Sequence, residues 1–168
     1  MNFKDFGRGM AAVLGMGLAG LLTASGATRY VTPTGAGGLT GADWANAYNN
    51  LQSAVNDCLG EASTIYMLTG RYAIATPVNI VGAPDLTVQG GCTGSGTATT
   101  TDDVTVIYRS TGNIKLLAAT NSTLKFDSLT WTNGFARDGT ITRGFTFQLN
   151  TCKSTFTNCA IRDNNSNA

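Results

Sequence analysis

The fold is decided by residues 30–60, which read YVTPTGAGGLTGADWANAYNNLQSAVNDCLG. After a glycine-rich loop, apolar residues recur every three or four positions, a spacing that predicts one face of a helix; they are Trp44, Ala47, Tyr48, Leu51, Val55 and Cys58. Asp43 can cap the first turn, and Gly60 is a typical stop. Because a lone amphipathic helix needs apolar cover, we expect this segment to cap the strands that follow it.

Residues 1–27 predict a secretory signal peptide. Two basic residues outweigh one acidic residue near the start, and residues 11–22 form an apolar run that is too short to span a bilayer. Small residues precede an expected cleavage point after Ala27. A buried N-terminal helix is the alternative, but the glycines of this stretch would weaken it. We therefore expect a protein that is secreted or held at the cell surface.

The expected mature chain, residues 28–168, carries no net charge. The whole sequence has 11 basic and 10 acidic residues, of which two and one, respectively, precede the cleavage point, so nine of each are left. This balance gives no electrostatic reason to expect nucleic acid or an anionic membrane as a partner. The length predicts one domain, built from an N-terminal strand and capping helix (28–62) and a strand-rich part (63–168).

The four cysteines predict disulfides, because an exported chain meets an oxidising compartment. Of the three possible pairings we favour Cys58 with Cys92 and Cys152 with Cys159, the first of which would tie the cap helix to the strands. Free buried thiols are the alternative. With no histidine in the sequence, the usual catalytic triads and zinc sites are excluded. We expect neither a cofactor nor a metal ion.

The rest of the chain predicts short strands separated by Gly, Asn and Asp turns, one of them at Gly90-Gly91, which is typical of an all-β fold. Several runs alternate apolar and polar residues, the period of a half-buried strand. The expected strands are Thr64–Leu68, Val78–Val81, Leu86–Gln89, Val104–Tyr108, Ile114–Leu117, Thr123–Phe126, Leu129–Thr132, Gly144–Leu149 and Ser154–Thr157.

One internal repeat favours a solenoid among the β architectures. Residues 130–139 align with residues 155–164 at an offset of 25, with six of ten positions identical or similar. A period in the twenties is what one coil of a β-solenoid requires. The alignment predicts Trp131 stacked on Phe156 inside the coils, and an exposed ladder of ion pairs from the Arg-Asp pairs at 137–138 and 162–163.

The opening of the mature chain resembles right-handed parallel β-helix proteins of the pectin-lyase-like superfamily, and the later coils resemble its surface and polymorphic outer-membrane relatives. The segments that carry this likeness are Tyr30–Gly35, Asp43–Ala47, Leu51–Val55, Ile65–Tyr72, Trp131–Asn133 and Thr155–Cys159. The resemblance implies a right-handed parallel β-helix whose N-terminal end is covered by a capping helix. About three coils fit, fewer than such proteins usually have, so we expect either a truncated reading frame or a short protein whose open end docks a partner.

Residues that can carry chemistry are few. Asp102, Asp103 and Asp127 could form a calcium site of the kind that family lyases use, with Arg109 or Lys125 as the base. The two adjacent aspartates are equally typical of a solvated turn, which we favour. Trp44 and Trp131 could stack on sugars, but their positions favour the core.

The sequence therefore predicts an exported, non-catalytic β-helix scaffold or adhesin-like surface protein that binds carbohydrate or another cell-surface ligand. The alternative is the N-terminal fragment of a polysaccharide lyase or glycoside hydrolase whose catalytic coils are missing.

Overall fold

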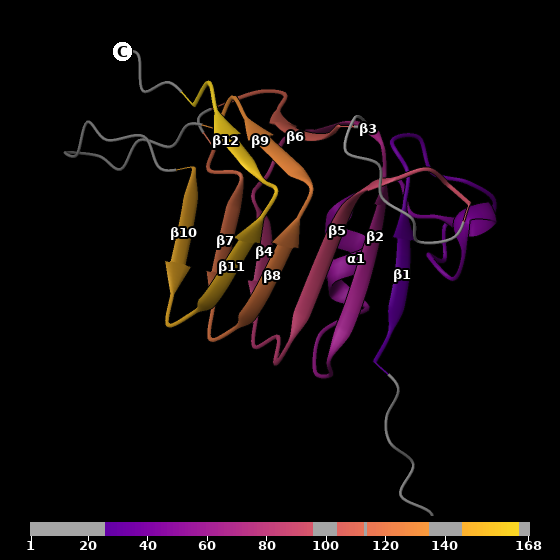
Figure 1. The fold of residues 1–168 in the computed structure, drawn as a ribbon, viewed down its shortest axis with the longest axis horizontal. Helices are drawn as coiled ribbons and strands as arrows, with labels where there is room; N and C mark the ends of the chain where they lie inside the picture. The colour runs from indigo at the N-terminus through magenta and orange to yellow at the C-terminus, as the bar shows by residue number, and fades with distance from the viewer. Residues whose placement is uncertain (1–25, 96–103, 113, 135–145, 165–168) are drawn as a thin grey trace, which may run out of the picture.

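Twelve short strands and two short helices make up the part of the chain that the computed structural model describes, residues 26–95, 104–112, 114–134 and 146–164 (Figure 1). The strands are β1 (Thr28–Val31), β2 (Ser63–Leu68), β3 (Gly70–Ile74), β4 (Val78–Val81), β5 (Leu86–Cys92), β6 (Thr105–Arg109), β7 (Leu117–Thr120), β8 (Thr123–Asp127), β9 (Leu129–Thr132), β10 (Phe147–Asn150), β11 (Lys153–Thr157) and β12 (Ala160–Arg162). The helices are the 3₁₀ helix η1 (Trp44–Asn46) and α1 (Leu51–Asn56).

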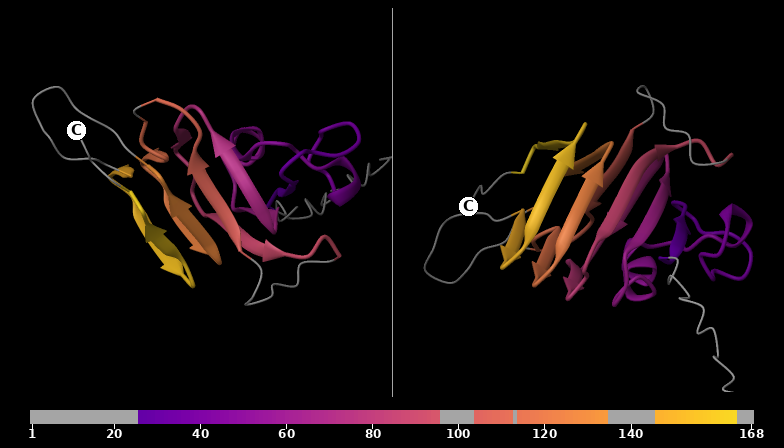
Figure 2. Two further views of the ribbon diagram at one scale, coloured as in Figure 1. Left: turned by 90° about the horizontal axis from the view of Figure 1, so that it is seen from above. Right: turned by 60° about the horizontal axis from the view of Figure 1, so that its bottom comes forward.

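The strands form three parallel sheets. The first sheet has the order β1-β2-β5-β8-β11, the second β3-β6-β9-β12 and the third β4-β7-β10. From β2 onward, consecutive strands belong to the first, second and third sheet in turn, and every third strand lies parallel beside its predecessor. We call each set of three consecutive strands a tier. Three complete tiers are followed by a fourth that is represented by β11 and β12 (Figure 2).

Alternation along the strands directs one set of side chains into the core. In β2 and β8 every second residue is buried, and the intervening residues are half-buried or exposed. The largest fully buried side chains include Trp131, Phe126, Ile65 and Met67. In the last tier the inward positions lie at sheet edges, and Ile161 there is 51% exposed although its partner Trp131 is fully buried. Burial by a following tier is therefore what completes the core.

The cap is built from two short helices instead of the single helix expected from residue 43 to residue 58. Asp43 does act as an N-cap, but of the three-residue η1. The chain then becomes extended, Tyr48 forms a β-bridge with Val31, and Asn50 caps α1 by accepting a hydrogen bond from the Ser53 amide. Asparagine competes with the helical backbone in this way, which explains the break. The apolar face of α1 is buried as expected.

Two of the strand edges at the cap end of the sheets, those of β1 and β4, are covered by hydrogen bonds from the cap. On β1, the Tyr30 amide donates to the Gly41 carbonyl at 3.0 Å, and the Tyr48 amide donates to the Tyr30 carbonyl at 2.9 Å. On β4, the side-chain amide of Gln52 receives the Asn79 N–H at 2.7 Å and donates to the Asn79 carbonyl at 3.0 Å. Gln52 thus forms the two hydrogen bonds that a neighbouring strand would form. It satisfies the backbone N–H and C=O of Asn79, which could otherwise pair with a strand of another chain.

Most predicted strands are present, but two were missed and two were displaced. Strands β3 and β12 were not expected, and β7 begins at Leu117 instead of residue 114. Strand β10 begins at Phe147, three residues later than expected. The pair Gly90-Gly91, expected in a turn, lies within β5.

The 25-residue alignment is wrong, because the structure pairs residues at an offset of 30. Phe126 lies beside Phe156, with ring centroids 5.1 Å apart, and Trp131 lies beside Ile161. The left-handed turn residues follow the same spacing: Ser128 and Asn158, at φ 54° and 51°, occupy equivalent corners. The length of the connection between β9 and β10 determines the offset of 30 residues. A local sequence match does not reveal that length.

Neither expected disulfide is formed, since all four cysteines are free thiols. Cys58 lies near Ser63 at the start of β2, whereas Cys92 pairs with Leu68 at its end. The five-residue β11 likewise separates Cys152 from Cys159. At about 3.3 Å per residue, either strand holds its two cysteines farther apart than the ~7 Å that a disulfide tolerates between α-carbons.

Thiol reactivity should divide the cysteines into two pairs. Cys58 and Cys92 are fully buried, and burial raises the pKa of Cys58 and raises that of Cys92 to about 11, so neither forms the reactive thiolate at neutral pH. Burial also raises the pKa of the half-buried Cys159, so we expect Cys152 to react first. The measurement is alkylation of the unreduced native protein followed by mass spectrometry. Four labels after denaturation are expected; fewer than four would indicate a disulfide.

A buried tyrosine fixes the corner between β1, β2 and β3. The Tyr72 hydroxyl lies 2.7 Å from the Leu68 carbonyl oxygen and 3.1 Å from that of Val31, and it donates to these acceptors inside the core. Burial raises the pKa of Tyr72. Because the pKa of Tyr72 is higher in the folded than in the unfolded state, its contribution to the free energy of unfolding is complete below pH ~10. This contribution is lost as the pH rises further.

Replacing this hydroxyl should destabilise the fold measurably. We expect Tyr72→Phe to lower the free energy of unfolding by about 0.5–1.5 kcal/mol, because the Val31 and Leu68 carbonyls lose a buried hydrogen-bond donor, although Leu68 still accepts from the Thr105 hydroxyl at 3.2 Å. The control is Tyr108→Phe, whose half-buried ring lies under the Arg71 guanidinium at 4.7 Å and should keep that contact. Urea unfolding monitored by circular dichroism measures both. Equal stability of Tyr72→Phe and wild type would contradict the role of the corner.

Several predictions fall on residues outside the described ranges. They are the signal peptide up to residue 25, Asp102 and Asp103, and the Arg-Asp pair at 137–138. The second member of the expected ladder, Arg162 and Asp163, is an exposed ion pair with 4.0 Å between the charged atoms.

Candidate functional site

The outer face of the first sheet brings residues from all four tiers and the cap into two rows. The parallel registers place one residue from each strand side by side. In the interior strands these residues alternate with fully buried neighbours, such as Val88 and Phe126. The first row, here the aromatic row, is Tyr30, Tyr66, Gln89, Asp127 and Thr157. The second, here the threonine row, is Thr28, Thr64, Thr87, Lys125 and Thr155.

Three aromatic side chains form a continuous strip at the cap end of the aromatic row. The ring centroids of Tyr30 and Tyr66 are 5.7 Å apart at an interplanar angle of 31°. Trp44 extends the strip, with its centroid 4.8 Å from that of Tyr30 at an angle of 63°. All three residues are only partly buried. Large aromatic side chains that stay accessible on a sheet face provide an apolar surface with polar edges, which suits a ligand of mixed character.

The cap loop holds Trp44 against this strip. Asp43 accepts hydrogen bonds from the backbone and side-chain nitrogens of Asn46, at 2.8 and 3.0 Å, and so closes the turn that carries Trp44. Gly41 has φ +68°, and a β-carbon there would lie 2.3 Å from the Tyr48 ring. Only glycine therefore allows the loop to approach Tyr48 while its carbonyl pairs with Tyr30.

A charged cluster under the cap fixes the same loop from the other side. The Asp57 carboxylate accepts a 3.1 Å hydrogen bond from Arg29 and a short one from the Tyr48 hydroxyl. The Tyr48 bond, followed by Arg29, lowers the pKa of Asp57, and the same bond raises the pKa of Tyr48. Asp57 is partly exposed, so the cluster serves mainly to fix geometry.

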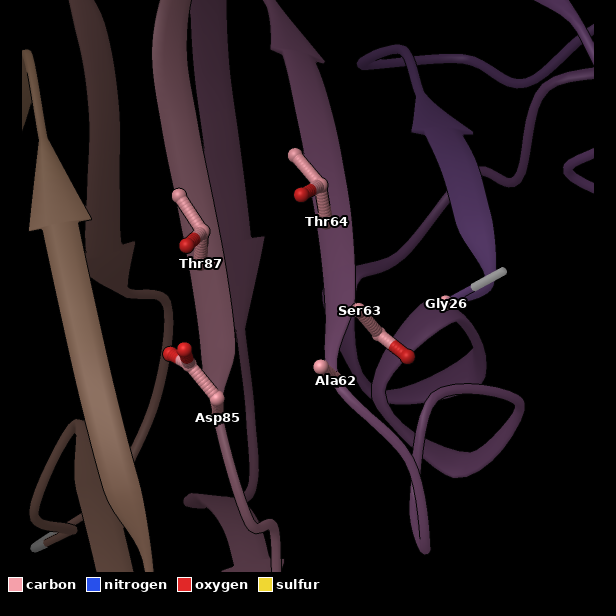
Figure 3. A pocket seen from close by; sticks show the side chains of 6 residues that line it. All are labelled: Gly26, Ala62, Ser63, Thr64, Asp85 and Thr87. Atoms are coloured by element: carbon pink, nitrogen blue, oxygen red, sulfur yellow. The ribbon is translucent and has the colours of Figure 1, made fainter. Parts of the chain in front are cut away.

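A shallow pocket of about 220 Å³ opens beside the threonine row (Figure 3). It is lined by Gly26, Ala62, Ser63, Thr64, Asp85 and Thr87. Figure 3 shows Thr64 and Thr87 side by side on neighbouring strands, with Asp85 below them. Asp85 forms a salt bridge with Lys125 at 2.8 Å, so these two charges compensate each other. The pocket thus offers hydroxyl groups and one paired carboxylate to a ligand.

Asp127 is the single charged member of the aromatic row, and its partners are neutral. Its carboxylate accepts hydrogen bonds from the Ser128 hydroxyl at 2.9 Å and from the Asn158 side-chain amide at 3.1 Å. Both donors hold the side chain in place without cancelling its charge. The row therefore carries, between Gln89 and Thr157, a fixed carboxylate that can accept further hydrogen bonds.

Of the calcium and base residues considered from the sequence, the structure describes Asp127, Lys125 and Arg109, while Asp102 and Asp103 lie outside the described residues. Asp127 and Lys125 lie two residues apart on β8, while Arg109 ends β6 in the second sheet and donates to the Gly112 carbonyl and Asn133. Within the described ranges, no group of three or more acidic, cysteine or histidine residues is arranged to hold a metal ion.

The prediction that both tryptophans lie in the core is wrong for one of them. Trp131 is fully buried as expected, whereas Trp44 is half-buried on the aromatic strip. Trp44 does not pack on a helical core face because its turn ends at Asn46. Nothing in the sequence indicated that Tyr30 and Tyr66 are neighbours, which only the strand register shows.

Comparison of the chain with family models, with curated proteins and with solved structures gave no match. In the described part of the chain, neither helix has the length and apolar character needed to cross a membrane.

Proposed function

We propose that this protein is an exported, non-catalytic scaffold of the right-handed parallel β-helix type, related to the pectin-lyase-like superfamily, and that it binds carbohydrate on the outer face of its first sheet. The return of every third strand to the same sheet supports the β-helix. Parallel strands joined by crossovers within one sheet are nearly always right-handed. The resemblance of the cap segment supports the family.

The observation that carries carbohydrate binding is the aromatic strip in register with polar side chains. A sugar ring has an apolar face of C–H groups, which packs on aromatic rings, and a rim of hydroxyl groups, which needs donors and acceptors. Tyr30 and Tyr66 provide the aromatic rings. The donors and acceptors come from Gln89, Asp127 and the threonine row. A rigid sheet keeps these groups at fixed spacing, so little ordering is needed on binding.

The test is retention on insoluble polysaccharides, followed by titration calorimetry with soluble oligosaccharides of each retained type. Tyr66→Ala should weaken binding about tenfold or more, because it removes the aromatic ring that lies between Tyr30 and the polar part of the row at Gln89. Tyr108→Ala is the matched control, since Tyr108 is also a half-buried strand tyrosine but belongs to the second sheet. Equal loss in both variants, or no retention of the wild type on any polysaccharide, would refute the proposal.

Export is tested separately. The full chain expressed in a bacterial host should appear outside the cytoplasm with Thr28 as its first residue. A cytoplasmic product that retains Met1 would refute export and leave the binding site unaffected.

A further inference from the structure

We infer that the ligand of the aromatic row is a neutral polysaccharide whose chain crosses the strands of the first sheet, and that Asp127 excludes acidic polysaccharides. This inference rests on the proposed carbohydrate binding and names its substrate class.

The orientation follows from the register. The five residues of the aromatic row lie on five neighbouring strands, which are spaced ~4.8 Å apart, so the row is perpendicular to the strands and about 19 Å long. The Trp44 ring adjoins Tyr30, which is the first residue of the row. A chain of sugars on this row stacks first on the aromatic rings and then meets Gln89 and Asp127 in succession.

The charge of the row determines the class of sugar. Tyr30, Tyr66 and Gln89 are uncharged, as are Thr28, Thr64 and Thr87 beside them. Lys125 is the charged member of the threonine row, and its ammonium group is engaged by Asp85.

Among the described residues, the side chains that donate hydrogen bonds to the carboxylate of the aromatic row are those of Ser128 and Asn158, and they bring no positive charge. A polymer with a carboxylate on every sugar would place like charges next to Asp127, whereas a neutral polymer presents hydroxyl donors to it.

A chemically matched pair of ligands tests this inference. Oligogalacturonate and the same oligomer after reduction of its carboxyl groups to primary alcohols differ in charge and keep the linkage. A neutral glucose oligomer of equal length extends the comparison. We expect the carboxyl-reduced oligomer to bind the wild-type protein at least about tenfold more tightly than the uronate at low salt. The preference should shrink as salt screens the repulsion.

Variants identify the residue responsible. Asp127→Asn should bring the affinity for the uronate to within about threefold of that for the reduced oligomer, because it removes the repulsion. Asp163→Asn is the control, since Asp163 is exposed after β12 and lies outside the row. Gln89→Ala should weaken hexasaccharide binding more than disaccharide binding if the chain crosses the strands, and Gln148→Ala on the third sheet should change neither. Thermal unfolding checks that each variant is folded.

The outcomes distinguish failure of this inference from failure of the proposed carbohydrate binding. Uronate binding equal to or tighter than that of the reduced oligomer would overturn the inference and leave carbohydrate binding intact. If Asp163→Asn also lost the preference for the reduced oligomer, Asp127 would not be the residue that discriminates against the uronate. Failure of every oligosaccharide to bind would refute the proposed function itself.

Discussion

Phe126→Ala is expected to lower the free energy of unfolding by about 3–5 kcal/mol, the usual range for removing a fully buried aromatic side chain. Phe126 is 1% exposed, and its ring contacts those of Trp131 at 5.6 Å and Phe156 at 5.1 Å. The resulting cavity would lie between two tiers, where strands of all three sheets limit how far the surroundings can collapse.

The chain supplies its own matched control, Phe156→Ala. Phe156 has the same side chain at the same position one tier later, but it is only partly buried because its strand is a sheet edge. We expect a loss of about 1–2 kcal/mol. The measurement is the urea midpoint at constant m-value. Equal losses in the two variants would contradict the assignment of Phe126 to an interior tier.

The same variants distinguish the two registers. The structure predicts a coupling of about 0.5–1.5 kcal/mol between Phe126 and Phe156 in a double-mutant cycle, because their rings stack. The 25-residue alignment would instead couple Phe156 directly to Trp131. A larger coupling for the second pair would favour the sequence alignment over the structure.

Local patterns predicted the strands well and their partners poorly. Strands β4 and β9 have the predicted bounds, because Val, Ile, Leu and Thr alternate between clear turn signals. Strand β12 is only three residues long and lacks such a pattern. Register depends on the length of the connections between tiers, and these differ: Leu86 pairs with Leu124, 38 residues on, whereas Leu124 pairs with Ser154, 30 residues on. The described strands therefore have no fixed period that an alignment could detect.

The candidate site could not be predicted from the sequence, because it too depends on the strand register. Tyr30 and Tyr66 are separated by 36 residues, and nothing in either segment indicates that they are neighbours. Trp44 joins them because Asn50 starts a new helix and frees the preceding turn. The acidic residues considered from the sequence, by contrast, were grouped by chemistry alone, and of these the structure describes Asp127, which it places in the aromatic row. A surface formed by register becomes visible only when the register is known.

Gly90→Ala is expected to destabilise the protein by about 3 kcal/mol or more, a large effect for one methyl group. A β-carbon at Gly90 would lie 2.3 Å from the Ser128 carbonyl oxygen and 2.7 Å from a Leu129 methyl group. The Ser128 backbone cannot easily withdraw, because its amide donates to the Thr157 carbonyl of the next tier at 3.1 Å. The added carbon must therefore push two tiers apart.

The control for this glycine is Gly38→Ala in the cap loop. The nearest atoms to a β-carbon there are 3.7 Å away, so we expect a change within about 0.5 kcal/mol. Urea unfolding of both variants gives the comparison, and a larger side chain, as in Gly90→Val, should increase the loss further. A stability for Gly90→Ala close to that of Gly38→Ala would mean that β5 and the corner after β8 do not lie in contact. Because Gly90 was expected in a turn, where alanine is far better tolerated, this variant separates the interior strand position from the turn predicted by sequence.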